Sequence, residues 1–283
     1  MSKHVTSPDR YLVPPPKPTP LVCQTLIAED ETGTQSEVFI VNEKPLTIYL
    51  NSREIVTAMT IGDHPHWLAL GFLANQAMLD GANPVTEVEH DEELGVVVVR
   101  TQEPTDFEGK MNKRVQTSGC AQGTVFADVM EQFESRSLSD ITMAITTAEL
   151  ASLTKAINTT ASLYLEAGAI HGTVLCSRHE PLVFMEDVGR HNAVDKVAGW
   201  MHETGTAAHD KLLYTTGRLT SEMVIKTVMM GIPILVSRSG FTASGVELAR
   251  KAGLTLIGRA RGERHLVMAH GHRLIRGAKV EVA

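Results

Sequence analysis

A single cysteine stands between two glycines in the stretch TSGCAQGT, residues 117–124, where small and polar side chains leave a thiol open. A nucleophilic cysteine needs access and a stabilised thiolate. The glycines let another backbone or a large substrate approach, and N–H groups of such a loop can stabilise a thiolate or persulfide anion. The alternative is a packing role, which suits Cys23 and Cys176 better because one follows a proline arm and the other lies in an apolar run. Cys120 is therefore the candidate catalytic residue.

Four further stretches combine glycine, arginine and hydroxyl side chains where a predicted strand ends. They are EDVGRHNAVDK (186–196), TTGRLTSE (215–222), SRSGFTASG (237–245) and GRARGER (258–264). A helix N-terminus presents free N–H groups, and arginine and hydroxyl groups beside them suit phosphates. One such turn would be ordinary helix capping, but several favour an anionic ligand such as a nucleotide or pyrophosphate. The candidate binding residues are Arg190, His191, Gly217, Arg218, Ser237, Arg238, Ser239, Arg259, Arg261 and Arg264.

His171, in AIHGTVLC, is a candidate general base or metal ligand. A zinc deaminase would need H-x-E here and a later P-C-x-x-C. Gly172 and Thr173 follow this histidine, and the second element is absent from the sequence, so we expect no zinc. A cysteine hydrolase that uses His171 as its base stays open, because geometry decides between these roles.

The composition limits the class of protein. The chain has 283 residues, of which 43% are hydrophobic and 21% charged, and this balance is typical of one large or two small globular domains. The formal net charge of -7 argues against general nucleic-acid binding. No apolar run approaches the roughly 20 residues that span a bilayer, and residues 1–20 lack the apolar core of a secretion signal. Three scattered cysteines do not suggest a disulfide framework or a zinc knuckle. We expect a cytoplasmic protein without nucleic-acid or membrane partners.

Helices and strands alternate in the second half of the chain. Thr146 or Thr147 as a cap, with Glu149 in the first turn, predicts a helix that ends near residue 160. Strands are predicted in 167–177, 180–188, 211–217, 232–240 and 254–262, and helices in 190–205, 220–231 and 242–253. Alternation at this spacing predicts an α/β fold with a parallel or mixed sheet covered by helices.

The first half is predicted to be a smaller α+β unit. SEVFIVNEKPLTIYL (36–50) suggests a hairpin that turns at NEKP, and GVVVVRT (95–101) a strand. DHPHWLALGFLANQAML (63–79) suggests a helix capped by Asp63 and stopped by Gly81. The predicted organisation comprises an extended proline-rich arm (1–20), the α+β unit (21–115), a glycine-rich cysteine loop and linker (116–137), and an α/β domain (138–283).

These stretches resemble a known family. LALGFLANQAML (68–79), MEDVGRHNAVDKVAGW (185–200) and the run from YTTGRLTSE to GRARGER (214–264) are similar to the FdhD family, and the resemblance extends over about 35–268. Its members are sulfur carriers, or sulfurtransferases, that formate dehydrogenase requires for activity.

The resemblance implies a mechanism. A cysteine desulfurase would pass sulfane sulfur to Cys120, and the persulfide would deliver it to the molybdenum or tungsten bis-molybdopterin guanine dinucleotide cofactor of formate dehydrogenase. The cofactor would bind through its guanine dinucleotide portions, which makes GDP a mimic. The family's cofactor-binding stretch falls on Arg259, Ala260, Arg261, Gly262, Glu263 and Arg264. The implied fold of the second half is a cytidine-deaminase-like three-layer mixed sheet, commonly dimeric.

One position departs from the family pattern. Many members carry S-S-C-G-x-C-G, and Gly123 stands here in place of the second cysteine. A single cysteine can still carry a persulfide if the donor or acceptor thiol is external. Two alternatives remain from the residues: a cofactor-binding chaperone without sulfur chemistry, and a cysteine hydrolase of a nucleotide-like substrate.

Overall fold

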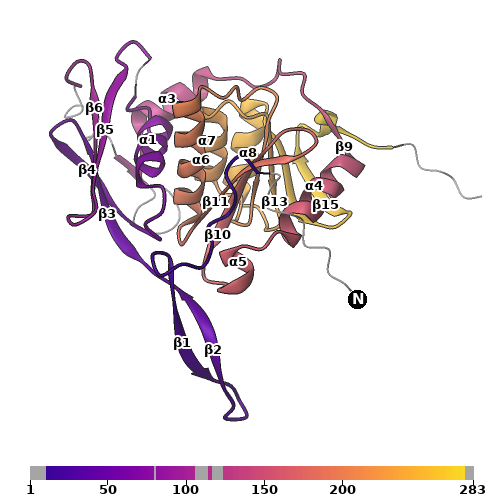
Figure 1. Cartoon of the computed structure of the whole chain (residues 1–283). Coiled ribbons are helices and arrows are strands. Elements are labelled where there is room, and N and C mark those ends of the chain that lie inside the picture. Colours follow the sequence, from indigo (N-terminus) through magenta and orange to yellow (C-terminus); the bar gives the residue numbers. More distant parts are fainter. Residues whose placement is uncertain (1–10, 80, 106–113, 117–123, 278–283) are drawn as a thin grey trace, which may run out of the picture.

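A six-stranded mixed sheet forms the centre of the second half (Figure 1). The computed structural model describes residues 11–79, 81–105, 114–116 and 124–277. The strand order is β11-β10-β12-β13-β14-β15; the pairs β12–β13 and β13–β14 are parallel, and the outer pairs are antiparallel. The strands are β10 (His171–Cys176), β11 (Pro181–Asp187), β12 (Leu212–Thr215), β13 (Ile234–Ser237), β14 (Thr255–Arg261) and β15 (Arg264–Ala269).

Helices cover both faces of this sheet, which makes three layers (Figure 1). Leu175, Leu213 and Leu235 pack toward α6, α7 and α8, whereas Tyr214 and Val236 pack toward α4. Because successive side chains of a strand point to opposite faces, these short apolar strands are buried on both sides. The helices are α4 (Thr147–Thr159), α6 (Arg190–Thr204), α7 (Ser221–Met229) and α8 (Ala243–Ala252). The prediction of a mixed sheet covered by helices is confirmed.

Local capping explains where these helices begin and end. Thr146 caps α4 through a reciprocal capping box with Glu149, as predicted. Gly205 and Gly253 follow α6 and α8 in the left-handed conformation, with φ of 63° and 77°. The strand β15 was not predicted, because the polar stretch 258–264 suggested a ligand loop rather than the turn of a hairpin.

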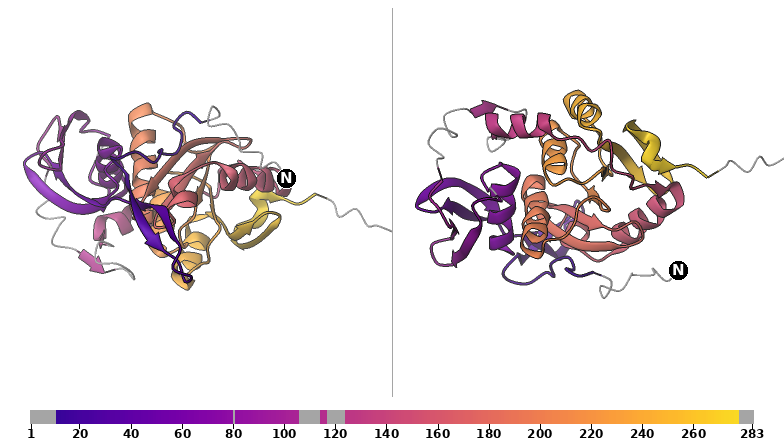
Figure 2. Two further views of the ribbon diagram at one scale, coloured as in Figure 1. Left: turned by 60° about the horizontal axis from the view of Figure 1, so that its bottom comes forward. Right: turned by 90° about the horizontal axis from the view of Figure 1, so that it is seen from above.

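The first half forms a four-stranded sheet in the order β4-β3-β6-β5, with α1 beside it. Its elements are β3 (Lys44–Leu50), β4 (Arg53–Thr60), α1 (Pro65–Asn75), β5 (Val85–Asp91) and β6 (Val96–Thr101). The helix α1 lies directly against α6, and Figure 2 shows the two side by side. A Cβ added at Gly71 would lie 1.7 Å from the Asp195 carbonyl oxygen, and one at Gly199 would lie 1.9 Å from the Trp67 oxygen. The two backbones therefore touch, and one apolar core runs from this sheet to α6 and α7.

The predicted hairpin at NEKP is wrong. The strand β2 (Gln35–Val41) pairs with β1 (Cys23–Glu29), and β3 pairs with β4. Asp30 Oδ1 accepts hydrogen bonds from the backbone N–H groups of Thr32 and Thr34, so it builds a tight turn before β2. The β1–β2 hairpin extends away from the body of the molecule (Figure 1).

The predicted limits of α1 are also wrong. His64, at φ 45°, occupies the N-cap position, and the Asp63 carboxylate binds the Lys196 ammonium instead of capping. The helix ends at Asn75, before the predicted stop at Gly81. Tertiary pairing of Asp63 has overridden the local capping preference.

The described part of the proline-rich arm lies along β11, the outermost strand on one side of the large sheet. Leu12 donates its N–H to the Leu182 oxygen at 2.8 Å, and Val13 forms a parallel bridge with Val183. The remaining elements are β7 (Arg114–Gln116), β8 (Thr124–Phe126), α3 (Ala127–Ser135), β9 (Ile145–Thr146), α5 (Leu163–Glu166), a 3-10 helix (Gly271–Arg273) and β16 (Leu274–Ile275). No helix in the described ranges has the length and apolar character needed to span a membrane.

Candidate anion-binding site

The predicted binding turns meet where the central strands of the six-stranded sheet end. This end of the strands is the binding edge. Residue pairing sets this edge: His171 lies opposite Asp187, Thr173 opposite Thr215, and Thr215 opposite Ser237. The start of β10 and the carboxyl ends of β11, β12 and β13 therefore coincide. Ligands of open α/β sheets bind outside the carboxyl ends of parallel strands.

Hydrogen bonds join the turns after β12 and β13. The Ser237 hydroxyl donates to the Gly217 oxygen at 2.6 Å and accepts from the Ser239 N–H at 2.9 Å. The Gly217 N–H in turn donates to the Thr215 hydroxyl at 3.1 Å. Since Ser237 is fully buried, its hydroxyl positions the turns, and the half-buried Ser239 lies nearer to solvent.

The turn after β12 packs tightly against the start of α6. A Cβ added at Gly217 would lie 2.9 Å from the Arg190 Cβ, so only glycine permits this approach. Arg190 is largely buried and Arg218 is exposed. The two arginines bring positive charge to the same place, in a chain with a net negative charge.

Two histidines lie beside these arginines. Burial is the main cause that lowers the pKa of His171, and the charges of Arg190 and Arg218 add to it. Burial, with Lys226 and Arg190 as the next causes, lowers the pKa of His191 to about 2. Both imidazoles are therefore neutral at neutral pH. His171 Nδ1 lies 3.2 Å from the Thr216 hydroxyl.

His191 is held by a carboxylate from α7. Its Nε2 lies 3.1 Å from Glu222 Oε2, in a pair whose carboxylate is buried. Burial is the main cause that raises the pKa of Glu222, and the Lys226 and Arg190 charges oppose this rise. The contact places the His191 ring beside Glu222 at this end of the strands. Glu222 itself lies within TTGRLTSE, although the sequence did not single it out.

The N-termini of α7 and α8 differ in capping. The Thr242 hydroxyl accepts a hydrogen bond from the Gly245 N–H at 3.2 Å, so α8 caps itself. Thr220 holds the same position in α7 but makes no capping bond. Its hydroxyl is buried and has no hydrogen-bond partner among the described residues. Helix α7 therefore begins without a side-chain cap, and its first turn carries the buried side chain of Glu222.

The stretch GRARGER forms the end of the β14–β15 hairpin, beyond the same edge. Arg261 lies opposite Arg264, and Gly262 makes the turn with φ 59°. Arg259 is held at φ 53°, an unusual conformation for a side chain with a Cβ, and its N–H donates to the Ser239 oxygen at 2.8 Å. Ala260 is packed in the core below. The three arginines and Glu263 are exposed.

Cys23 and Cys176 are packing residues, as expected. Cys176 is fully buried and burial raises the pKa of its thiol, while Cys23 is also buried and free, so both serve as packing residues. Cys120 lies outside the described residues. Within the described ranges, no three His, Cys, Asp or Glu side chains are arranged to hold a metal ion.

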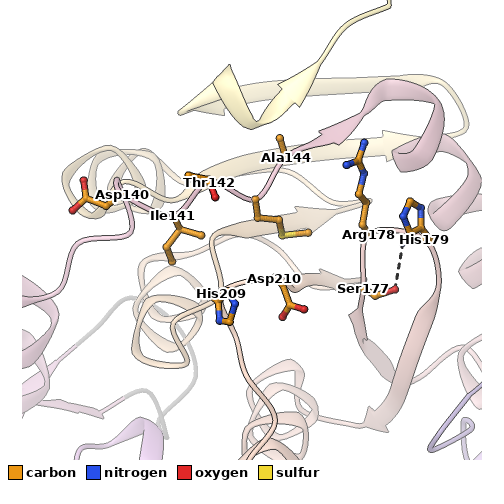
Figure 3. Close-up of a pocket in the computed structure, with 10 residues that line it drawn as sticks. Asp140, Ile141, Thr142, Ala144, Ser177, Arg178, His179, His209 and Asp210 are labelled. Carbon is orange, nitrogen blue, oxygen red and sulfur yellow. Dashed lines mark hydrogen bonds between the residues drawn. The ribbon is translucent and has the colours of Figure 1, made fainter.

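A pocket of about 670 Å³ opens at the opposite end of the sheet (Figure 3). Its walls come from residues 140–144, 177–179 and 209–210. The Arg178 side chain there is bonded to the Glu149 carboxylate at 2.8 Å. None of the predicted binding residues lines this pocket, so its size does not make it the candidate site.

A family model supplies the assignment. The model described as the FdhD/NarQ family matches residues 41–275 of the chain. The chain belongs to the FdhD/NarQ family. The resemblance to the FdhD family, drawn from residues 68–79, 185–200 and 214–264, is thereby confirmed.

Relatives of this FdhD/NarQ chain agree in name. A protein of Listeria innocua called "Sulfur carrier protein FdhD" is 30% identical over 254 residues, which cover 86% of this chain and 95% of that protein. A Bacillus subtilis protein of the same name is 30% identical over 236 residues, which cover 83% of this chain and 90% of that protein. The crystal structure of a protein assigned as a formate dehydrogenase accessory protein, from Desulfotalea psychrophila, matches with a TM-score of 0.71 at 28% identity. That match covers 90% of this chain and 99% of the other.

Proposed function

We propose that this FdhD/NarQ chain is a sulfur carrier that serves formate dehydrogenase. In this proposal Cys120 accepts sulfane sulfur from a cysteine desulfurase and delivers it to the bis-molybdopterin guanine dinucleotide cofactor, which carries molybdenum or tungsten. The Cys120 thiolate attacks the terminal sulfur of the desulfurase persulfide, the S–S bond there breaks, and the desulfurase cysteine leaves as a thiolate. With glycine at position 123, the sulfur then leaves to an acceptor outside the loop.

One observation carries the cofactor part of the proposal: the turns after β11, β12 and β13 converge at one sheet edge. The donors proposed for a diphosphate are the exposed Arg218 and the uncapped N-terminus of α7, whose first turn also carries the buried Glu222. The buried Thr220 hydroxyl, without a partner among the described residues, supports a ligand at this point. Arg190 and the exposed Arg259, Arg261 and Arg264 would hold the anionic dinucleotide, with GDP as its mimic.

Two further parts belong to the same proposal. The three-layer second half is of the cytidine-deaminase type, and the protein is a cytoplasmic homodimer that uses no zinc. Equilibrium sedimentation of the full chain at micromolar concentration checks the dimer, since a mass of one chain would contradict it.

Mass spectrometry of the sulfur adduct tests the sulfur chemistry. After incubation of the purified chain with a cysteine desulfurase and cysteine, we expect one added sulfur on the peptide that contains Cys120. The variant Cys120→Ser should show none, while Cys176→Ser, which removes a buried thiol, should retain the adduct. An active desulfurase and a folded chain without an adduct would refute sulfur transfer through Cys120.

A further inference from the structure

We propose that Tyr164 and Arg238 form a stacking surface for the purine base of a nucleoside diphosphate. The phosphates of that ligand would bind the adjacent turns, so this inference rests on the proposed function. Neither the sequence patterns nor the names of the relatives point to Tyr164, which lies far from the binding turns along the chain.

The two side chains meet from different elements. Tyr164 is on the short helix α5, and Arg238 is the first residue after β13. The Arg238 Cζ lies 5.2 Å from the centroid of the Tyr164 ring. Both side chains are half-buried, so each keeps a surface that a ligand can reach. Aromatic rings and guanidinium groups are the side chains on which nucleobases stack.

The tyrosine is held in place before any ligand arrives. The backbone N–H groups of Leu163 and Tyr164 donate to the two carboxylate oxygens of Glu186, at 2.9 and 2.8 Å. Glu186 is fully buried at the end of β11. Leu163 is packed with Ile61 and other buried side chains. These bonds fix the backbone that carries Tyr164, and the Arg238 contact positions its ring, so less freedom is lost when a base binds.

The surface is continuous with the phosphate site. The Arg238 N–H donates to the Thr215 oxygen at 3.4 Å, and the next residue, Ser239, bonds to Ser237 at the centre of the joined turns. Arg238 therefore belongs to both parts: its backbone lies in the turn and its side chain lies on the ring. In this arrangement the base of a nucleotide would stack on Tyr164 while the phosphates of the same nucleotide bind the turns.

Calorimetric titration with two probes tests the surface. GDP reports base and phosphates together, and inorganic pyrophosphate reports the phosphate site alone. We expect the wild-type chain to bind GDP more tightly than pyrophosphate. Tyr164→Ala should weaken GDP binding roughly 5- to 150-fold, the range that base–aromatic stacking spans, and change pyrophosphate binding less than about twofold.

Three control variants keep this test decisive. Tyr164→Phe retains the ring and should bind GDP within about twofold of wild type. Leu165→Ala alters the next, exposed residue of α5 and should leave both affinities unchanged. Arg238→Lys keeps the charge without the planar group and should weaken GDP more than pyrophosphate.

The outcomes separate this inference from the proposed function. If Tyr164→Ala binds GDP as the wild type does, the stacking surface is wrong and the phosphate site stands. Equal loss of GDP and pyrophosphate would also overturn the surface, because it would indicate a displaced turn. If the wild-type chain binds neither probe, the nucleotide site of the proposed function fails, and the stacking surface fails with it.

Discussion

At the scale of single residues, surroundings decide the chemistry of His191. Its side chain is 24% exposed and lies beside the buried Glu222 carboxylate, yet burial and the nearby Lys226 and Arg190 charges keep it neutral. The unfolded chain has an ordinary histidine pKa of about 6.5. Between pH 6.5 and 2 the unfolded chain therefore binds a proton that the folded chain does not, and stability falls as the pH falls.

The pH dependence of unfolding tests this reasoning. In urea unfolding, the free energy of unfolding of the wild type should fall by about 1.4 kcal/mol more than that of His191→Asn when the pH is lowered from 7.5 to 5.5. This is the free energy of binding one proton to the unfolded chain one pH unit below a pKa of about 6.5. His171 and Glu222 are present in both chains and serve as the internal control. Parallel pH profiles for the two chains would mean that folded His191 takes up the proton and forms an ion pair with Glu222.

At the scale of elements, the close packing of α1 on α6 determines how the two halves meet. A Cβ at Gly199 would lie 1.9 Å from the Trp67 oxygen, which is backbone and cannot move aside like a flexible side chain. The helices would have to separate and give up apolar contacts between them. Since α6 begins at Arg190, a shift of this helix would reach the binding edge.

The variant Gly199→Ala measures this contact. Alanine favours a helix by about 1 kcal/mol over glycine, but the clash should outweigh it and lower the free energy of unfolding by about 1 to 3 kcal/mol. Gly81→Ala is the matched control, because its added Cβ meets nothing within 4 Å. A change within about 0.5 kcal/mol for Gly199→Ala in urea unfolding would contradict this close packing of α1 on α6.

The sequence predicted local elements better than their partners. Periodicity and caps located the helices and strands of the second half, because α4, for example, is fixed by its own Thr146–Glu149 capping box. The hairpin predicted at NEKP is wrong because two consecutive β-branched runs do not show which other strand each of them pairs with. Asp63 was misassigned because its partner, Lys196, is distant in the sequence. The arginines and glycines of the site were found from turn composition, whereas Tyr164 reaches the site only through tertiary packing.

At the scale of the molecule, buried polar contacts attach the first half to the binding edge. Lys196 is fully buried between Asp63 of the first half and Asp187 of the second, and its Nζ lies 2.5 Å from Asp187 Oδ2. The Thr60 hydroxyl donates to the same Asp187 oxygen, and Asn192 donates to the Met59 oxygen at 2.7 Å. Burying a charge costs desolvation free energy, which only a well-placed partner offsets. These paired contacts therefore hold the turn after β11 in one position.

The most direct test of the whole account is restoration of formate dehydrogenase activity in a bacterial strain that lacks its own FdhD/NarQ protein. The wild-type chain should restore activity, and Cys120→Ala, expressed to the same level and folded, should restore none. Loss of activity would show that binding of the cofactor at the sheet edge is insufficient without the carried sulfur. Full activity of Cys120→Ala would contradict the sulfur-carrier account and leave a cofactor-binding chaperone in its place.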